Sequence, residues 1–244
     1  MKNFISLLVL ISFVLANDEF LENFQICERS DPKLNECLKE AIQKAFLYIE
    51  NGVEKFKIPS MQPLELESWT VKATKSLPFD QQYKNGELYN YSTSKIEQVQ
   101  AIINDDNFSI YINGHVPIVK FSGQYQYDNA VFYGENLTGN GTLLFIEYGN
   151  VFLVNMTGRV NRNGNKPTLE IVSVSLEDTV EMMDINIDRL HVELSAQSSD
   201  HLSKHWGVIF NELAVGYSEM YAFAFKTIAN TIFSQLDYDK LFPK

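Results

Sequence analysis

Residues 198–236 have the pattern of one long helix that carries far more apolar surface than an ordinary surface helix. The three charges in its apolar part share a seven-residue spacing, which places them on one narrow stripe; they are Glu212, Glu219 and Lys226. The opposite face is apolar at helical spacing; its residues are Trp206, Phe210, Leu213, Tyr217, Tyr221, Ala224, Ile228 and Ile232. Such a helix has to be enclosed by the rest of the chain.

Short runs with strand character fill most of residues 64–195. The runs are 64–67, 69–71, 88–91, 108–112, 119–127, 130–133, 142–148, 151–160, 168–176 and 185–194. Turn signals such as Asn85-Gly86, Asn113-Gly114 and Gly149-Asn150 separate many of them, and short connections give antiparallel neighbours. Residues 94–104 fit either a strand or a helical turn.

A shorter amphipathic helix is predicted ahead of these strands. Ser30 or Asp31 would cap it, Pro32 suits its first turn, and Asn51-Gly52 would end it. The order of elements is therefore helix, long antiparallel sheet, long apolar helix. We predict one α+β domain over residues 17–244, in which a strongly curved antiparallel sheet wraps round the C-terminal helix.

The N-terminus has the features of a secretory signal peptide. Lys2 precedes an apolar run over residues 4–15, which is too short to span a bilayer, and cleavage is predicted after Ala16. Residues 1–16 are therefore assigned to a leader, and the mature chain is predicted to be secreted. In that compartment the pair Cys27 and Cys37 is expected to form a disulfide.

The formal net charge of −11 argues against a nucleic-acid partner or an anionic membrane surface. No later segment has 18 apolar residues without a charge, so stable membrane anchoring is not expected. Five N-x-S/T sequons offer glycosylation sites in a secreted chain; they are Asn90, Asn107, Asn136, Asn140 and Asn155.

Catalytic and cofactor motifs do not stand out. The chain has no G-x-S-x-G elbow, no P-loop and no G-x-G-x-x-G sequence. His201 and His205 have the i, i+4 spacing of metal ligands, but no third ligand accompanies them. We therefore expect neither an enzyme nor a bound metal or cofactor.

Four groups of residues resemble the sequence motifs of one protein family. They are the Cys27…Cys37 pair at the first helix, Ile58-Pro59-Ser60 followed by Pro63-Leu64, Val116-Pro117 followed by Gly123-x-Tyr125 and Gly139-x-Gly141, and the ending from Trp206 to Tyr238-x-x-Leu241-Phe242-Pro243. In order and spacing they are similar to the takeout and haemolymph juvenile hormone-binding proteins of arthropods. Gln62 stands where that family often has an acidic residue, and only one disulfide is possible, which favours the takeout-like branch.

The resemblance implies a super-roll, in which a curved antiparallel sheet encloses a long helix and an elongated apolar tunnel. It also implies secreted binders of lipids, terpenoid hormones or odorant-like molecules, some of them linked to circadian output, feeding or chemosensation. The receptor of such a protein is not identified by the sequence.

The leading hypothesis is therefore a carrier that holds a small hydrophobic ligand in an internal tunnel. The predicted wall residues are Trp206, Phe210, Leu213, Tyr217, Tyr221 and Ile228 on the long helix, and Phe46, Ile49, Phe56, Trp69 and Val71 elsewhere. The alternative is a secreted glycoprotein of the same fold, with a filled core, that acts by surface recognition of another protein. A lipid-processing enzyme is the least supported of the three.

Overall fold

The protein is described by a computed structural model, which covers residues 19–244 apart from 133, 188–189 and 196–205. Its helices are α2 Leu34–Tyr48, α3 Trp206–Phe233 and α4 Tyr238–Leu241, with the short 3-10 turns η1 Glu54–Phe56 and η2 Tyr91–Thr93. Its strands are β1 Leu64–Leu66, β2 Trp69–Val71, β3 Gln81–Tyr89, β4 Lys95–Ile103, β5 Asn107–Tyr127, β6 Val131–Phe132, β7 Glu135–Asn136, β8 Gly139–Asn161, β9 Thr168–Thr179, β10 Met182–Ile187 and β11 Leu190–Ser195. The predicted leader over residues 1–16 lies outside the described residues.

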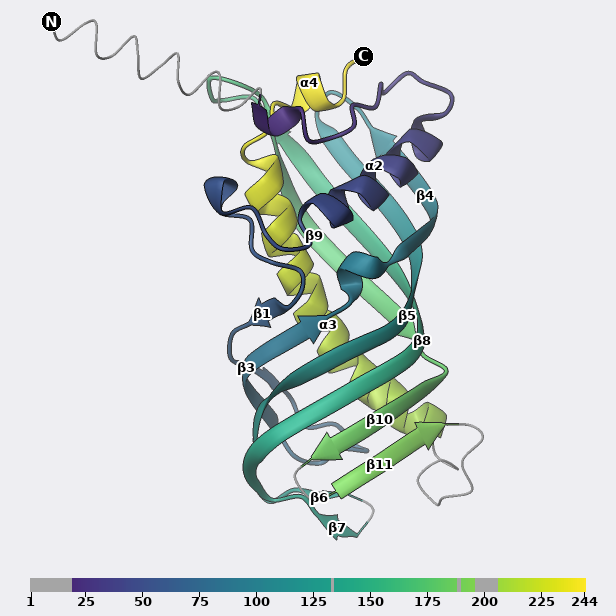
Figure 1. The fold of residues 1–244 in the computed structure, drawn as a ribbon, viewed down its shortest axis with the longest axis vertical. Helices are drawn as coiled ribbons and strands as arrows, with labels where there is room; N and C mark the ends of the chain where they lie inside the picture. Colours follow the sequence, from purple (N-terminus) through teal and green to yellow (C-terminus); the bar gives the residue numbers. More distant parts are fainter. Residues whose placement is uncertain (1–18, 133, 188–189, 196–205) are drawn as a thin grey trace, which may run out of the picture.

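Two long antiparallel strands form the spine of a nine-stranded sheet. β5 and β8 pair along nearly their whole length, from Asn107 opposite Arg159 to Tyr127 opposite Gly139. Strands β4 and β9 flank one end of this pair, while β3 and β10 flank the other. Figure 1 shows the sheet twisting and curving strongly along its length.

The sheet curves round α3 without closing on itself. At one edge, β9 packs against α3. At the other edge lie β1 and β2, and Gly216 allows α3 to approach β2, because a Cβ at this position would lie 2.3 Å from Val71 Cγ1. Four residues of α3 face solvent between the two edges, at a spacing of four; they are Val215, Glu219, Phe223 and Thr227. We call this surface the exposed strip.

The charged stripe of the sequence only partly coincides with the exposed strip. Glu219 is exposed, whereas Glu212 and Lys226 are half-buried and turn toward opposite edges of the sheet. The Oγ of Ser76 donates to Glu212 at 3.3 Å, and Nζ of Lys226 donates to the carbonyl oxygen of Val172 on β9 at 2.6 Å. The predicted helix over 198–236 ends at Phe233, and its first residues lie outside the described part of the chain.

Several local predictions were wrong. Asn85-Gly86, Asn113-Gly114 and Gly149-Asn150 do not turn the chain, because β3, β5 and β8 run through them. Gly114 lies opposite Phe152, and a Cβ there would come within 2.4 Å of the phenyl ring. Glycine at this position therefore makes room for an inward aromatic side chain.

The other differences are smaller. The run 185–194 falls on two antiparallel strands, β10 and β11, and most of the ambiguous residues 94–104 form β4. The first helix begins after Lys33, so neither Ser30 nor Asp31 is its N-cap. The carboxylate of Asp31 instead accepts from the Lys33 backbone N–H at 2.8 Å, just before the helix.

A cluster of contacts joins the N-terminal segment to the C-terminal tail, at the end of the curved sheet that lies beside α2. Cys27 and Cys37 form the predicted disulfide, with Cα atoms 5.8 Å apart. The backbone N–H of Arg29 donates to the carbonyl of Pro243 at 2.7 Å, and its nearly buried guanidinium reaches Asp105 and Asp239 at 2.9 and 3.0 Å. The N-terminal segment, the β4–β5 turn and the C-terminal tail are thereby held together, beside α4 (Figure 1).

Candidate ligand-binding site

An apolar cavity of about 150 Å³ lies between α2, the concave face of the sheet and α3. Its lining residues are Ile42, Ala45, Phe46, Ile49, Met61, Tyr91, Phe108, Ile110, Ile112, Phe152, Val154, Met156, Phe225, Ile228, Ala229, Ile232 and Phe233. Every one is apolar except for the Tyr91 hydroxyl. The alternation of β5 and β8 produces this wall, because residues two apart point to the same face.

Three of the predicted wall residues meet at this cavity: Phe46 and Ile49 from α2, and Ile228 from α3. Other predicted wall residues lie elsewhere. Phe56 is buried against Phe20, with ring centroids 4.1 Å apart, and Val71 packs against α3 at Gly216. These two residues belong to the core and do not line the cavity.

Tyr91 is the one lining residue of the cavity that carries a polar group. Its ring contacts those of Phe152, Tyr221 and Phe225, with centroids 5.8, 5.8 and 5.1 Å away. Its buried hydroxyl has no hydrogen-bond partner among the described residues. Burial raises the pKa of this hydroxyl well above its ordinary value, and the charge of Glu147 adds to the effect. The predicted wall residue Tyr221 thus stands behind the cavity rather than in its wall.

Beyond Tyr91, aromatic side chains fill the interior. The hydroxyl of Tyr83 hydrogen-bonds to those of Tyr127, at 2.9 Å, and Tyr217. Phe121 and Phe145 pack on Tyr217, and Trp69 stacks on Tyr83 at 4.7 Å. Predicted wall residue Tyr217 is thus part of a packed aromatic cluster.

Three more predicted wall residues belong to α3. Phe210 is buried. Helix α3 also contains Trp206 and Leu213, but the positions of their side chains lie outside the described part of the structure.

Two carboxyl groups meet inside the roll where β8, β9 and α3 come together. The side-chain nitrogen of Asn150 donates to Glu147 at 2.7 Å and to Asp178 at 3.2 Å, and the Ser218 hydroxyl donates to Asp178 at 3.0 Å. Burial raises the pKa of both carboxyl groups, and the charge of Asp178 adds to the effect on Glu147. We call Glu147 and Asp178 the acidic pair.

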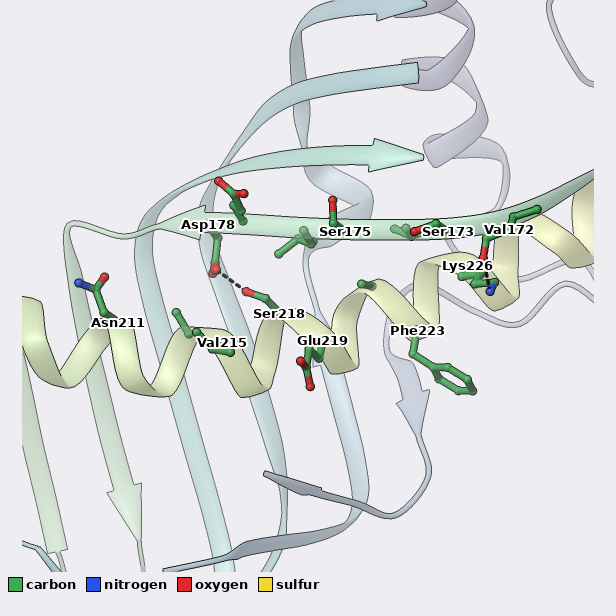
Figure 2. A pocket seen from close by; sticks show the side chains of 15 residues that line it. Val172, Ser173, Ser175, Asp178, Asn211, Val215, Ser218, Glu219, Phe223 and Lys226 are labelled. Carbon is green, nitrogen blue, oxygen red and sulfur yellow. Dashed lines mark hydrogen bonds between the residues drawn. The ribbon is translucent and has the colours of Figure 1, made fainter. Parts of the chain in front are cut away.

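An open groove of about 680 Å³ runs between β9 and α3, and Figure 2 shows it from close by. Asp178 and Ser218 meet across it, whereas Phe223 points away from β9. Val172, Val215 and Phe223 are 48%, 63% and 74% exposed along its borders. We call it the β9 groove.

A second open groove, of about 890 Å³, runs between α3 and the edge formed by β1 and β2. Its apolar floor includes Leu64, Leu66, Met220 and Ala224. Trp69, a predicted wall residue, lines this groove rather than the cavity, while Ile228 lines both. We call it the β1 groove.

No set of three or more His, Cys, Asp or Glu side chains suited to a metal occurs among the described residues, and His201 and His205 lie outside them. No helix in the described ranges is long and apolar enough to cross a membrane.

Four sequon asparagines, at positions 107, 136, 140 and 155, are exposed. The fifth, Asn90, is half-buried, and its Nδ2 donates to the carbonyl of Ile118 at 3.0 Å.

Sequence reasoning missed most of the cavity wall. Phe108, Ile110 and Ile112 alternate along β5, and Phe152, Val154 and Met156 alternate along β8. Both sets follow a period of two, which is a signal for one shared face. The signal did not show that these two faces converge on α2 and α3.

The sequence model of the family described as haemolymph juvenile hormone binding protein matches residues 6–243. No curated protein matches the chain by sequence. Among solved structures, Takeout 1 of Epiphyas postvittana superposes with a TM-score of 0.73 over 90% of this chain and 100% of its own, at 13% identity. A lipopolysaccharide binding protein matches at a TM-score of 0.40 and 12% identity, over 79% of this chain and 38% of its own.

The Takeout 1 comparison shows the fold, and the family match spans nearly the whole chain. The curved, unclosed antiparallel sheet with a long C-terminal helix agrees with that match. The chain therefore belongs to the haemolymph juvenile hormone binding protein family.

Proposed function

We propose that this protein is a secreted carrier that holds a small hydrophobic molecule inside its rolled sheet. The observation that carries the proposal is the cavity between α2, the sheet and α3, which is lined by apolar side chains. Apolar cavities with few polar groups suit apolar ligands. The family supports a role as a binder of hydrophobic ligands rather than as an enzyme.

The affinity of such a site would come from burial. Each methylene group moved from water into the cavity contributes about 0.8 kcal/mol before the costs of binding. An apolar cavity of about 150 Å³ accommodates a benzene-sized molecule. A lipid, terpenoid or odorant-like ligand would therefore place one end of its apolar chain here.

Secretion is part of the proposal. The predicted leader over residues 1–16 and the Cys27–Cys37 disulfide both suit an oxidising, extracellular compartment. The four exposed sequon asparagines would then be accessible for glycosylation.

The experiment begins with the full chain expressed in animal cells and purified from the culture medium. Its organic extract is analysed by mass spectrometry, and the stripped protein is titrated with a fluorescent acyl-chain probe. We expect secreted protein, a bound hydrophobic compound in the extract and saturable probe binding. Absence of a bound compound together with absence of probe binding would contradict the carrier function.

One observation favours the alternative of surface recognition. The exposed strip carries two large apolar side chains, Val215 and Phe223, which are 63% and 74% exposed, and aromatic side chains fill the interior beyond Tyr91. Exposed apolar surface of this kind often marks an interaction site. Failure of both ligand assays would leave this function as the better explanation.

A further inference from the structure

The β1 groove lies directly beside the apolar cavity. Ile228 on α3 lines both spaces. The segment that leads into β1 also borders both spaces, because Pro59 and Leu64 line the groove and Met61 between them lines the cavity. The two spaces therefore adjoin at this point, with Met61 and Ile228 at their boundary. A methionine suits such a partition because its side chain adopts many shapes.

The two spaces differ in volume. Pockets that hold drug-sized ligands measure roughly 300–1,000 Å³. The cavity, at about 150 Å³, is smaller than this range, whereas the β1 groove, at about 890 Å³, lies within it. An elongated ligand with one end in the cavity has to place its remainder in a neighbouring space, and the β1 groove has an apolar floor of Leu64, Leu66 and Met220.

The charge of the β1 groove restricts which molecules fit. Three carboxylates line it, and two of them, Glu65 on β1 and Glu87 on β3, lie directly opposite each other. Glu67 follows directly after β1 and also lines the groove. None of the described residues that line this groove is a lysine or an arginine. An anionic head group would therefore meet unfavourable charge on the β1 and β3 side of the groove.

We propose that the β1 groove is a lateral portal to the cavity and holds the head group of the bound ligand, which is accordingly a neutral amphiphile rather than a free carboxylate. This inference rests on the proposed carrier function. Uptake requires movement of Met61 and Ile228, after which the apolar chain occupies the cavity. The head group remains beside Glu65, Glu67 and Glu87.

The first experiment compares cis-parinaric acid with its methyl ester by fluorescence titration at pH 7.5 and low salt. The ester is more apolar than the acid, so tighter binding of the ester to the unaltered protein would not by itself demonstrate charge repulsion. The decisive measurement is therefore the affinity of each probe for the double variant Glu65→Gln/Glu67→Gln. We expect the double variant to bind the acid about tenfold more tightly, because two nearby like charges are removed, and to bind the ester as before. The matched control is Glu36→Gln/Glu40→Gln, which removes two exposed charges from α2.

The second experiment fills the groove from its exposed side. Thr227 lines the β1 groove on the exposed strip, so Thr227→Phe places a ring in the groove without entering the cavity. Stopped-flow mixing with the ester should show association slowed by about tenfold. Ser234→Phe adds the same ring at an exposed position of the chain just after α3 and should leave the rate unchanged. Circular dichroism melting of each variant verifies that the fold is retained.

The outcomes separate the two proposals. Binding of neither probe by the unaltered protein would contradict the carrier function and this inference together. Binding of both probes, with an acid affinity that the Glu65→Gln/Glu67→Gln variant does not improve, would contradict the head-group assignment alone. An association rate unchanged by Thr227→Phe would contradict the portal.

Discussion

The side chain of Asn230 on α3 takes the place of a neighbouring strand for Ile171 on β9. Its Oδ1 accepts from the backbone N–H of Ile171 at 2.7 Å, and its Nδ2 donates to the carbonyl oxygen of the same residue at 3.1 Å. Strand β9 is an edge strand, so these backbone groups have no strand partner on that side. A helix side chain thus satisfies the edge of the sheet.

Replacement of Asn230 by alanine should destabilise the protein by about 1–3 kcal/mol, because it leaves two backbone groups without these partners. Equilibrium unfolding in urea measures the change. Asn211→Ala, at an exposed position of the same helix, is the control and should have a much smaller effect. Equal losses in the two variants would mean that the paired hydrogen bonds contribute nothing specific.

The stability of the protein should depend on pH through the acidic pair. Burial, reinforced by the charge of Asp178, raises the pKa of Glu147 from 4.5 to about 8 in the folded state. Between these pH values the folded protein holds a proton that the unfolded chain has released. The free energy of unfolding should therefore fall as pH rises from about 4.5 to about 8.

Glu147→Gln removes the titrating group while retaining an acceptor for the side-chain nitrogen of Asn150. We expect this variant to be more stable than the parent at pH 8 and to show a flatter dependence of stability on pH. Urea unfolding at pH 5, 6.5 and 8 provides the comparison, with the exposed Glu219→Gln as control. A variant with the same pH dependence as the parent would contradict the role assigned to Glu147.

Two buried alanines of α3 line different spaces. Ala229 lines the cavity, whereas Ala222 lines the β9 groove. Ala229→Leu should lower the affinity for an acyl-chain probe by about tenfold, because the added atoms occupy ligand volume. Ala222→Leu adds the same volume and should leave probe affinity unchanged. The reverse ranking, measured by fluorescence titration, would place the ligand in the β9 groove instead.

The guanidinium of Arg29 should be important for holding the chain ends together. It is nearly buried, bonds to Asp105 and Asp239, and lies 5.4 Å from the centroid of the Tyr238 ring. Arg29→Met should cost about 2 kcal/mol in the free energy of unfolding, since hydrogen bonds to charged groups are among the stronger ones.

The matched control for Arg29→Met is Arg159→Met. Arg159 forms an exposed ion pair with Glu170 at 2.9 Å, and such pairs contribute little to stability. Chemical unfolding of both variants under identical conditions tests the contrast. An equally small effect at both sites would show that the contacts of Arg29 are dispensable.

The sequence was informative where a pattern extends over many residues. The apolar face of α3 and the alternation along β5, β8 and β9 were sufficient to predict a curved sheet round a long helix. Turn signals of two residues were less reliable. Asn113-Gly114 and Gly149-Asn150 lie inside strands because partners far away in sequence, such as Phe152 beside Gly114, decide the local conformation.

The candidate site was harder to predict for a geometric reason. Ile49 and Tyr217 both belong to buried apolar faces, yet only Ile49 borders empty space, since aromatic rings fill the volume around Tyr217. Whether a buried side chain meets a cavity depends on the curvature of the sheet and on residues that face it from other elements. Periodicity identifies the buried face of a strand or helix, but not the places where packing is incomplete.

The position of α3 between two free sheet edges has a consequence for biosynthesis. All strands of the sheet leave the ribosome before residues 206–233, so the nascent chain exposes the edges of β1 and β9 and the apolar inner face of the sheet. Until α3 docks, these exposed surfaces favour pairing with other chains. The cavity is complete only after α3 has been synthesised and has docked, so the proposed ligand could enter it only after that point.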